Sequence, residues 1–311
     1  MKSNGYLKFR QVLIKKKLAY IIMIGWFIIS LNQAFLQELN NSLEEERSLG
    51  LRLKYRSLQM GEVILIQFSN SPEVKEIEGE LFGHKLSFWR QGRFFHSLAG
   101  IDLFTKAGDY FLNLKVHFKN GLKLNKKYKI TIRNKSFGVQ HLNVDPRFIY
   151  LSADDLARVQ REREDLRKIW GKSSSEKLWH APFIEPLRAK ISSPFGLRRM
   201  FNDQPRGRHY GVDLDADIGN PVKATNSGRV VLARELFFAG NCIIIDHGKE
   251  IFSLYCHLSE ILVQKGEIVE RGQTIGQVGA TGRVTGPHLH WGIKIGGVNI
   301  SPYSLLCLSL E

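Results

Sequence analysis

Alternating apolar residues over positions 110–118 and 128–132 constrain the fold of this chain most strongly. Side chains two residues apart lie on the same face of a β-strand, so each run predicts a strand with one buried face. Asn120-Gly121 lies between the runs and favours the type I′ turn of a β-hairpin. We therefore predict a small β-sandwich over residues 61–145, without a catalytic constellation. Its core would receive Tyr110, Leu112, Leu114, Val116, Phe118, Tyr128, Ile130 and Ile132.

The last third of the chain shows a second β pattern, in which glycines separate short apolar runs. Gly266, Gly272, Gly276 and Gly279 interrupt residues 263–278 in this way. A chain of 311 residues with 43% hydrophobic residues can build about two packed domains. The expected fold class is mainly β, with an antiparallel β domain over residues 191–311.

A helix is expected between these two regions. Ser152-Ala153-Asp154-Asp155 resembles a capping box that precedes a highly charged stretch, residues 156–170. Its apolar stripe consists of Leu156, Val159, Leu166 and Ile169. We expect residues 146–190 to be a helical and extended linker, whose helix packs between the domains.

The N-terminus has the pattern of an export segment. Six positive charges and no acid precede an apolar run over residues 18–29. This run has the length of a signal-peptide core and is short for a membrane span, although it could extend to Leu36. No clear cleavage site follows, so residues 1–36 are expected to be a signal peptide or an uncleaved signal anchor, with residues 37–60 as a spacer. The basic end predicts that everything after it lies outside the cytoplasmic membrane.

The formal net charge of +15 indicates a basic surface. Such a surface can attract nucleic acid, an anionic membrane or an anionic polymer. The sequence contains no nucleic-acid-binding motif, so we expect no nucleic acid and favour attraction to a carboxylate-bearing cell wall. A merely solvated, lysine-rich surface remains an equal alternative.

Two pairs of potential metal ligands are separated in the sequence: His209 with Asp213, and His288 with His290. Residues two or four apart on an extended strand share one face, so two strands could present four polar side chains to one site. Imidazole nitrogens and a carboxylate are the usual ligands of catalytic Zn²⁺, which keeps one position open for water. His257, between the two pairs, supplies a further imidazole.

The remaining histidines have no partner at such a spacing and are expected to be surface or satisfied core residues. They are His84, His96, His117, His141, His180 and His247. Three cysteines, Cys242, Cys256 and Cys307, are too few for a disulfide scaffold. We expect buried free thiols, although a cross-strand disulfide between Cys242 and Cys256 is geometrically conceivable.

Five ordered motifs carry a family resemblance. They are Ser193-Pro194-Phe195-Gly196, Arg208-His209-Tyr210-Gly211-Val212-Asp213, Gly219-Asn220-Pro221-Val222-Lys223-Ala224, Tyr255-Cys256-His257-Leu258 and the segment from Thr281 to Trp291. Over about residues 191–306, this order resembles the lysostaphin/LytM-type zinc metallopeptidases of peptidase family M23. The resemblance implies a barrel-sandwich hybrid fold for the last domain. It also makes the preceding sandwich similar to the Ig-like domain of some exported members.

The resemblance further implies an activity and a role for each motif residue. One Zn²⁺ per chain would be bound by His209, Asp213 and His290, and His257 and His288 would be catalytic. The implied reaction is hydrolysis of peptide cross-links or stem peptides in bacterial peptidoglycan. Thr281 and Arg283, beside the glycines of residues 279–282, are candidate substrate contacts.

Two other functions remain open at this stage. Some members of the family have lost ligands and act as wall-binding regulators of other hydrolases. The glycine turns of residues 265–276 also resemble those of lipoyl-carrier folds, although no exposed modification lysine at a hairpin tip is seen. All five histidine and aspartate positions are filled here, which favours the active peptidase. The bond that is cut cannot be read from these residues.

Overall fold

The computed structural model describes residues 50–69, 71–308 and 310. The expected export segment over residues 1–36 lies outside this described part, as does most of the spacer. None of the helices in the described residues is long and apolar enough to cross a membrane.

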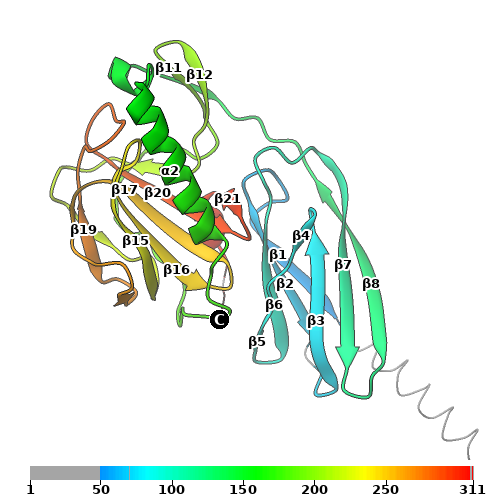
Figure 1. Cartoon of the computed structure of the whole chain (residues 1–311). Coiled ribbons are helices and arrows are strands. Elements are labelled where there is room, and N and C mark those ends of the chain that lie inside the picture. The colour runs from blue at the N-terminus through cyan, green and yellow to red at the C-terminus, as the bar shows by residue number, and fades with distance from the viewer. Residues whose placement is uncertain (1–49, 70, 309, 311) are drawn as a thin grey trace, which may run out of the picture. The chain divides into compact units, whose positions relative to one another are not determined.

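The described strands between residues 51 and 132 form two four-stranded sheets (Figure 1). The first has the order β1 (Leu51–Tyr55), β2 (Val63–Ser69), β6 (Phe94–Gly100) and β5 (Trp89–Gln91). The second has the order β4 (His84–Lys85), β3 (Val74–Leu81), β7 (Gly108–Phe118) and β8 (Lys123–Ile132). The sheets are tied by Arg90 of β5, which donates hydrogen bonds to the carbonyls of Val74 and Lys75 at 2.9 and 2.8 Å.

The hairpin of β7 and β8 confirms the alternation seen in the sequence. Leu112, Leu114 and Val116 are buried, and the two strands pair in antiparallel register. The predicted turn type is wrong, however. Only Gly121 has a positive φ, of 87°, whereas a type I′ turn would also need a positive φ at Asn120. The Asn120 side chain accepts a hydrogen bond from Leu122 N instead, and the single left-handed glycine matches a longer loop.

A larger sheet occupies most of the chain beyond residue 190. Its central order among the described strands is β10 (Ile191–Ser193), β13 (Val212–Leu214), β20 (Leu289–Ile295), β17 (Ile251–Ile261), β16 (Gly240–Gly248), β15 (Gly228–Leu236) and β18 (Ile268–Val269). Further strands pair beside it: β14 (Pro221–Lys223), β19 (Thr274–Val278) and β21 (Val298–Ile300), followed by the short helix α3 (Pro302–Leu306). All these pairs are antiparallel, which agrees with the expected fold class.

A fourth sheet contains the one parallel pair among the described strands. It has the order β12 (Gln204–Arg208), β11 (Arg198–Phe201) and β9 (Val139–Leu142), with β9 and β11 parallel. A 3-10 turn at Pro146–Phe148 follows β9. In this sheet β9, which lies before residue 146, pairs with β11, which lies beyond residue 190.

The helix α2 (Ala153–Trp170) begins where the capping pattern predicts, because Ser152 Oγ accepts a hydrogen bond from Asp155 N at 3.1 Å. Its packing differs from the expectation. Leu166, Ile169 and Trp170 pack on a cluster formed by β15, β16 and β17 rather than between domains, as Figure 1 also shows. Leu156 is 47% exposed and does not belong to the buried stripe. The helix instead buries the carboxylate of Glu162, which accepts hydrogen bonds from Phe237 N.

One hydrophobic cluster runs through the unit formed by residues 51–311. It contains residues from β2 and β6 together with the large sheet, and Trp89 meets Trp179 edge to face at 5.2 Å between ring centres. Backbone contacts add to it, since Val63 N donates to Ser304 Oγ at 2.9 Å and Ser301 N donates to Gly61 O at 2.7 Å.

The cysteines agree with the expectation only in part. Cys242 and Cys256 are buried free thiols, whereas Cys307 is exposed and corrects the expectation for that residue. Cys256 lies in the cluster under α2 and pairs in register with His290 of β20.

Candidate metal centre

Two neighbouring strands bring the predicted ligand pairs together. β13 and β20 are antiparallel, and Asp213 lies directly opposite His290 in their register. His209 precedes β13, so it reaches Asp213 through a short bend rather than along one strand, as the sequence had suggested. Gly211 makes this bend possible, because an added Cβ would lie 2.7 Å from His290 Nε2 and 2.5 Å from Trp291 O.

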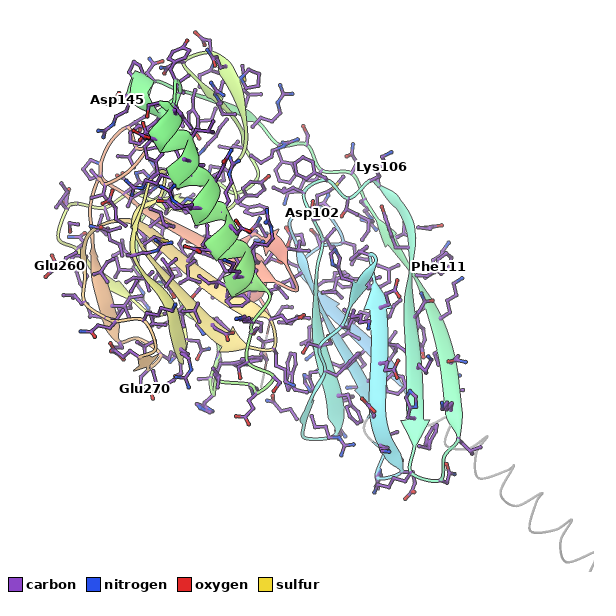
Figure 2. The ribbon with its side chains drawn as sticks, viewed as in Figure 1. Asp102, Lys106, Phe111, Asp145, Glu260 and Glu270 are labelled. Carbon is purple, nitrogen blue, oxygen red and sulfur yellow. The ribbon has the colours of Figure 1, made fainter. Side chains whose placement is uncertain are left out.

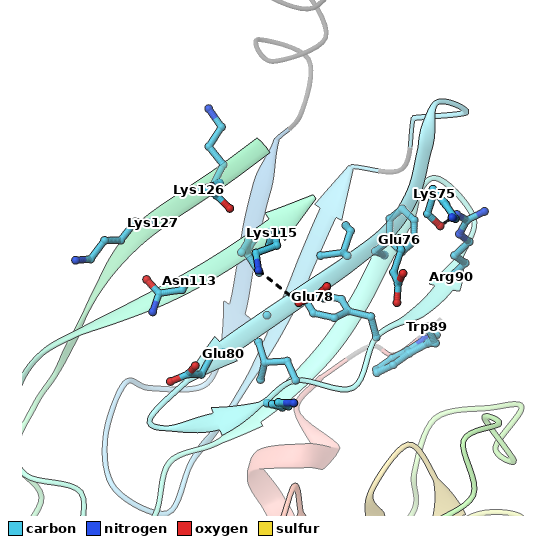
Figure 3. A pocket seen from close by; sticks show the side chains of 18 residues that line it. Lys75, Glu76, Glu78, Glu80, Trp89, Arg90, Asn113, Lys115, Lys126 and Lys127 are labelled. Carbon is cyan, nitrogen blue, oxygen red and sulfur yellow. Dashed lines mark hydrogen bonds and ion pairs between the residues drawn. The ribbon is translucent and has the colours of Figure 1, made fainter. Parts of the chain in front are cut away.

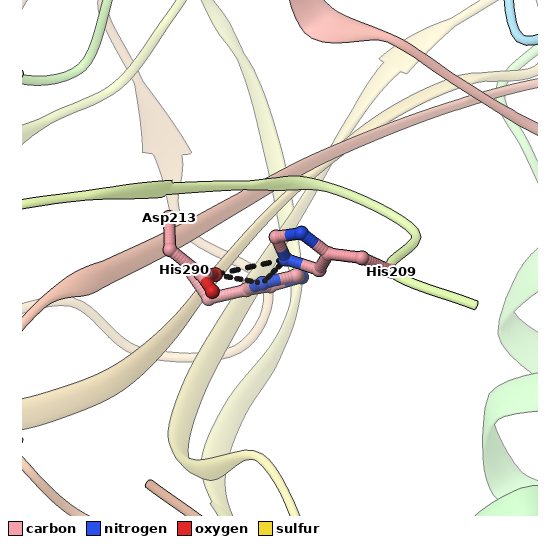
Figure 4. A group of neighbouring side chains, drawn as sticks. All are labelled: His209, Asp213 and His290. Carbon is pink, nitrogen blue, oxygen red and sulfur yellow. Dashed lines mark hydrogen bonds and ion pairs between the residues drawn. The ribbon is translucent and has the colours of Figure 1, made fainter. Parts of the chain in front are cut away.

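Three ligand atoms converge at this point, as Figure 4 shows. His209 Nε2 and His290 Nδ1 lie 2.9 and 2.8 Å from the same carboxylate oxygen, Asp213 Oδ1, and 3.0 Å from each other. Among the described residues, they form the group of ligand atoms able to hold a metal ion, all within 4.8 Å of one another. Two imidazole nitrogens and one carboxylate oxygen are a donor set that suits Zn²⁺ and leaves a fourth position open.

The electrostatics of the group depend on its burial. Burial lowers the pKa of His209 to about 4, against the opposing effect of Asp213. Burial also disfavours the charge on Asp213, but the adjacent imidazoles of His209 and His290 outweigh it and hold the pKa of the carboxyl well below its usual range. The carboxylate is therefore charged and His209 neutral near pH 7, which are the forms that bind a metal ion.

Neighbouring groups fix the orientation of these ligands. His209 Nδ1 lies 2.9 Å from Pro194 O and can donate to it, which leaves Nε2 free to face the group. Arg199 of β11 donates a hydrogen bond to Asp213 Oδ2, the oxygen that faces away from both imidazoles. Arg199 is not among the residues predicted from the sequence. Its only signal was its place just after the Ser193–Gly196 motif, and its partner lies 14 residues further on.

The two remaining histidines of the motifs lie beside the ligand group. The ring centre of His257 is 4.9 Å from that of His288 and 6.0 Å from that of His290. His257 Nδ1 lies 2.9 Å from Thr281 O, and His288 Nδ1 lies 2.8 Å from Gly286 O. Each Nδ1–H can donate to its carbonyl, so each Nε2 keeps a free lone pair.

The backbone of His257 is strained. Its φ of 65° lies in the left-handed region, which a non-glycine residue rarely adopts. Such strain at a buried histidine is typical of functional sites. Burial, with the nearby charges of His288 and His290, places the pKa of His257 well below its ordinary value, and burial also lowers the pKa of His288. Both imidazoles are thus neutral near pH 7 and able to accept a proton.

The two candidate substrate contacts differ in their surroundings. The hydroxyl of Thr281 is used within the protein, since it donates to Leu258 O at 2.8 Å and accepts from Asn241 N at 2.9 Å. Arg283 is half-buried, and its guanidinium lies over the rings of Phe201 and Phe238.

A cavity of about 870 Å³ lies away from these residues, at the sheet that contains β3, β7 and β8 (Figure 3). Its lining is rich in lysine and glutamate, with Lys115 and Glu78 paired at 3.9 Å. Both side chains are at least half exposed, so this pair contributes little to stability. The cavity contains none of the predicted site residues.

Comparison with known proteins places the site residues in a family. Residues 207–302 match peptidase family M23. The peptidoglycan DD-endopeptidase ShyA of Vibrio cholerae is 47% identical over 109 residues, which are 35% of this chain and 25% of that protein. The DD-carboxypeptidase/endopeptidase Mpg of Neisseria meningitidis is 40% identical over 39% of this chain and 28% of that protein. The match therefore spans only about a quarter of the length of these curated relatives.

A solved structure extends the likeness beyond the matched segment. A Pseudomonas aeruginosa protein assigned to peptidase M23 has a TM-score of 0.63 and 28% identity, and the match covers 81% of this chain and 96% of that one. The family segment includes the three converging ligands and both neighbouring histidines. Sequence, fold and site thus agree that residues 207–302 of this chain belong to peptidase family M23.

Proposed function

We propose that this protein is a zinc-dependent endopeptidase that hydrolyses peptide cross-links or stem peptides of bacterial peptidoglycan. The convergence of His209 Nε2, His290 Nδ1 and Asp213 Oδ1 carries the proposal. Lone pairs at such short separations repel one another unless a proton or a cation lies between them. The name of the relative ShyA, a peptidoglycan DD-endopeptidase, supports peptidoglycan as the substrate.

His209, Asp213 and His290 would hold one Zn²⁺ per chain. When bound, this ion would act as a Lewis acid and lower the pKa of a water molecule to about 7. Arg199 keeps Asp213 Oδ2 engaged, which would leave Oδ1 to bind the ion. Pro194 O keeps His209 in the tautomer that presents Nε2.

His257 and His288 are the proposed catalytic histidines. Each Nδ1 faces a carbonyl, so one Nε2 can accept a proton from the attacking water. The second histidine can donate to the departing amine or stabilise the oxyanion only while its own Nε2 carries a proton. Thr281 contributes through its carbonyl, which orients His257. Arg283 is the proposed contact to substrate.

The rest of the chain fits a protein of the cell envelope. We assign residues 1–36 to a signal peptide or signal anchor, residues 37–60 to a spacer and residues 61–145 to an Ig-like β-sandwich. The linker would cover residues 146–190, and the peptidase domain of barrel-sandwich type residues 191–311. An uncleaved N-terminal segment would hold the protein at the cytoplasmic membrane. The two four-stranded sheets and α2 support this division.

Digestion of purified peptidoglycan tests the proposal. The full-length protein with one zinc per chain should release peptide fragments with new amino groups, and mass analysis of these fragments identifies the bond. A chelator should remove zinc and activity together, and added Zn²⁺ should restore both. Wall binding that is indifferent to chelation, without release of amino groups, would instead assign the chain to the regulators of other hydrolases.

A further inference from the structure

The guanidinium of Arg283 is held between two aromatic rings. Its central carbon lies 4.3 Å from the ring centre of Phe201 on β11 and 4.4 Å from that of Phe238, which follows β15. Its backbone N also donates to Phe238 O at 2.9 Å. Contact with both rings restrains the guanidinium.

No acceptor meets the N–H groups of the Arg283 guanidinium within the part of the chain that the structure describes. No ion pair or side-chain hydrogen bond of Arg283 occurs there, unlike its neighbours. Arg199 donates to Asp213, and Arg206 donates to Gln204 Oε1. Burial, with the positive charges of Arg199 and Arg206, lowers the pKa of Arg283 to about 10. A half-buried cation without a counter-charge destabilises the protein unless an anion binds to it and neutralises its charge.

Two connections place this cation beside the metal group. Phe201 and Arg199 are two residues apart on β11, so they share a face roughly 7 Å apart, and Arg199 binds the ligand Asp213. Thr281, two residues before Arg283, orients His257 through its carbonyl. A peptide with its scissile bond at the metal group would therefore reach Arg283 with a neighbouring residue.

We propose that Arg283 is a specificity-determining residue that binds a free carboxylate of the peptide substrate. This inference rests on the proposed function and adds the chemical group that the substrate must carry. The planar guanidinium matches a carboxylate with two parallel hydrogen bonds, which lysine cannot reproduce. The alternative is that Arg283 merely clamps the segments of Phe201 and Phe238 together.

Cross-linked stem peptides that differ in a single group test the assignment. One synthetic dimer keeps all its carboxylates free, and the others have one carboxylate at a time converted to an amide. With the zinc-loaded wild type, one of these amidations should lower kcat/KM about 10- to 100-fold. Arg283→Gln should cleave the free and amidated peptides with similar kcat/KM. Arg283→Lys, which keeps the charge but lacks the planar guanidinium, should retain part of the preference.

Arg198→Gln is the matched control. Arg198 is exposed on β11, the strand that carries Phe201, and its side chain makes no contact to the ligand group. It should keep the full wild-type preference. Thermal unfolding and zinc content of each variant show whether it is folded. If Arg283→Gln unfolds at lower temperature yet keeps the carboxylate preference, Arg283 is a clamp and the inference fails.

Binding measurements separate this inference from the proposed function. The same peptides are titrated calorimetrically into the zinc-loaded wild type and into His288→Ala, so that a carboxylate preference can be seen without cleavage. Preferential binding that depends on Arg283, without hydrolysis by the wild type, would refute the function and keep the subsite. Hydrolysis of free and amidated peptides at equal rates would refute the subsite and keep the function. Neither binding nor hydrolysis would refute both.

Discussion

Two buried histidines of this protein share their depth of burial and the direction of their pKa shift. His209 is 1% exposed and His247 is fully buried, and burial lowers the pKa of each to about 4. Each Nδ1 can donate to a backbone carbonyl, that of Pro194 at 2.9 Å and that of Ser227 at 2.8 Å. The two regions differ at the other ring nitrogen. His247 Nε2 lies 2.7 Å from Ser253 Oγ, whereas His209 Nε2 faces a carboxylate and a second imidazole.

The difference shows which observation identifies a metal site. A hydroxyl can donate to His247 and complete its hydrogen bonds, so that region needs nothing more. A carboxylate oxygen and two imidazole nitrogens all present lone pairs, and they need a cation or a proton between them. Burial and a displaced pKa are therefore common to both regions, and only the convergence of lone pairs is particular to His209.

The largest effect is expected from His209→Ala. Removing one of three ligands should abolish stoichiometric zinc and lower hydrolysis by roughly three orders of magnitude, equivalent to about 4 kcal/mol of barrier. Zinc per chain is measured by elemental analysis, and activity by release of amino groups from peptidoglycan. Full zinc occupancy in this variant would remove His209 from the ligand set.

The variant His288→Ala distinguishes the proposed catalytic histidines from the proposed zinc ligands. Loss of an acid–base group should lower kcat by about 10²- to 10⁴-fold while most of the zinc stays bound. His290→Ala should lose zinc and activity together. Equal loss of zinc in the two variants would overturn the division of roles between these histidines.

The free energy of unfolding at acid pH should show that His247 is buried as a neutral imidazole. Its folded pKa of about 4 lies below the value of about 6.5 expected in the unfolded chain, so the unfolded state binds the proton first as the pH falls. Stability from the neutral imidazole is complete above pH 6.5 and is lost towards pH 4, by roughly 3 kcal/mol at most. Urea unfolding at pH 7 and pH 4.5 should show a larger loss for wild type than for His247→Gln. Equal losses would contradict the assignment.

The smallest effect is expected on the zinc content and kcat/KM of the His247→Gln variant. Because its ring nitrogens contact only Ser227 and Ser253, zinc should remain at one per chain and kcat/KM should stay within roughly threefold of wild type at pH 7.5. Activity is compared per zinc-loaded molecule. A loss as large as that of His288→Ala would erase the contrast between the two regions.

Local patterns predicted the local structure well. The alternation over residues 110–118 gave the buried face of β7, and Ser152 caps α2 as its sequence indicates. The errors arose where distant residues act. Leu156 is exposed because α2 buries Glu162 against Phe237 of another segment. The turn at Asn120 adopts a longer form than the Asn-Gly pair suggests.

The sequence by itself determined the chemical inventory of the site and the spacing within each ligand pair, because side-chain direction along extended chain depends only on neighbouring residues. Only the tertiary structure placed Asp213 opposite His290, added Arg199 behind the carboxylate and set Arg283 against the rings of Phe201 and Phe238. These contacts depend on the register of strands far apart in the chain. No local pattern encodes which strand lies next to which, because pairing is selected by burial of the whole sheet.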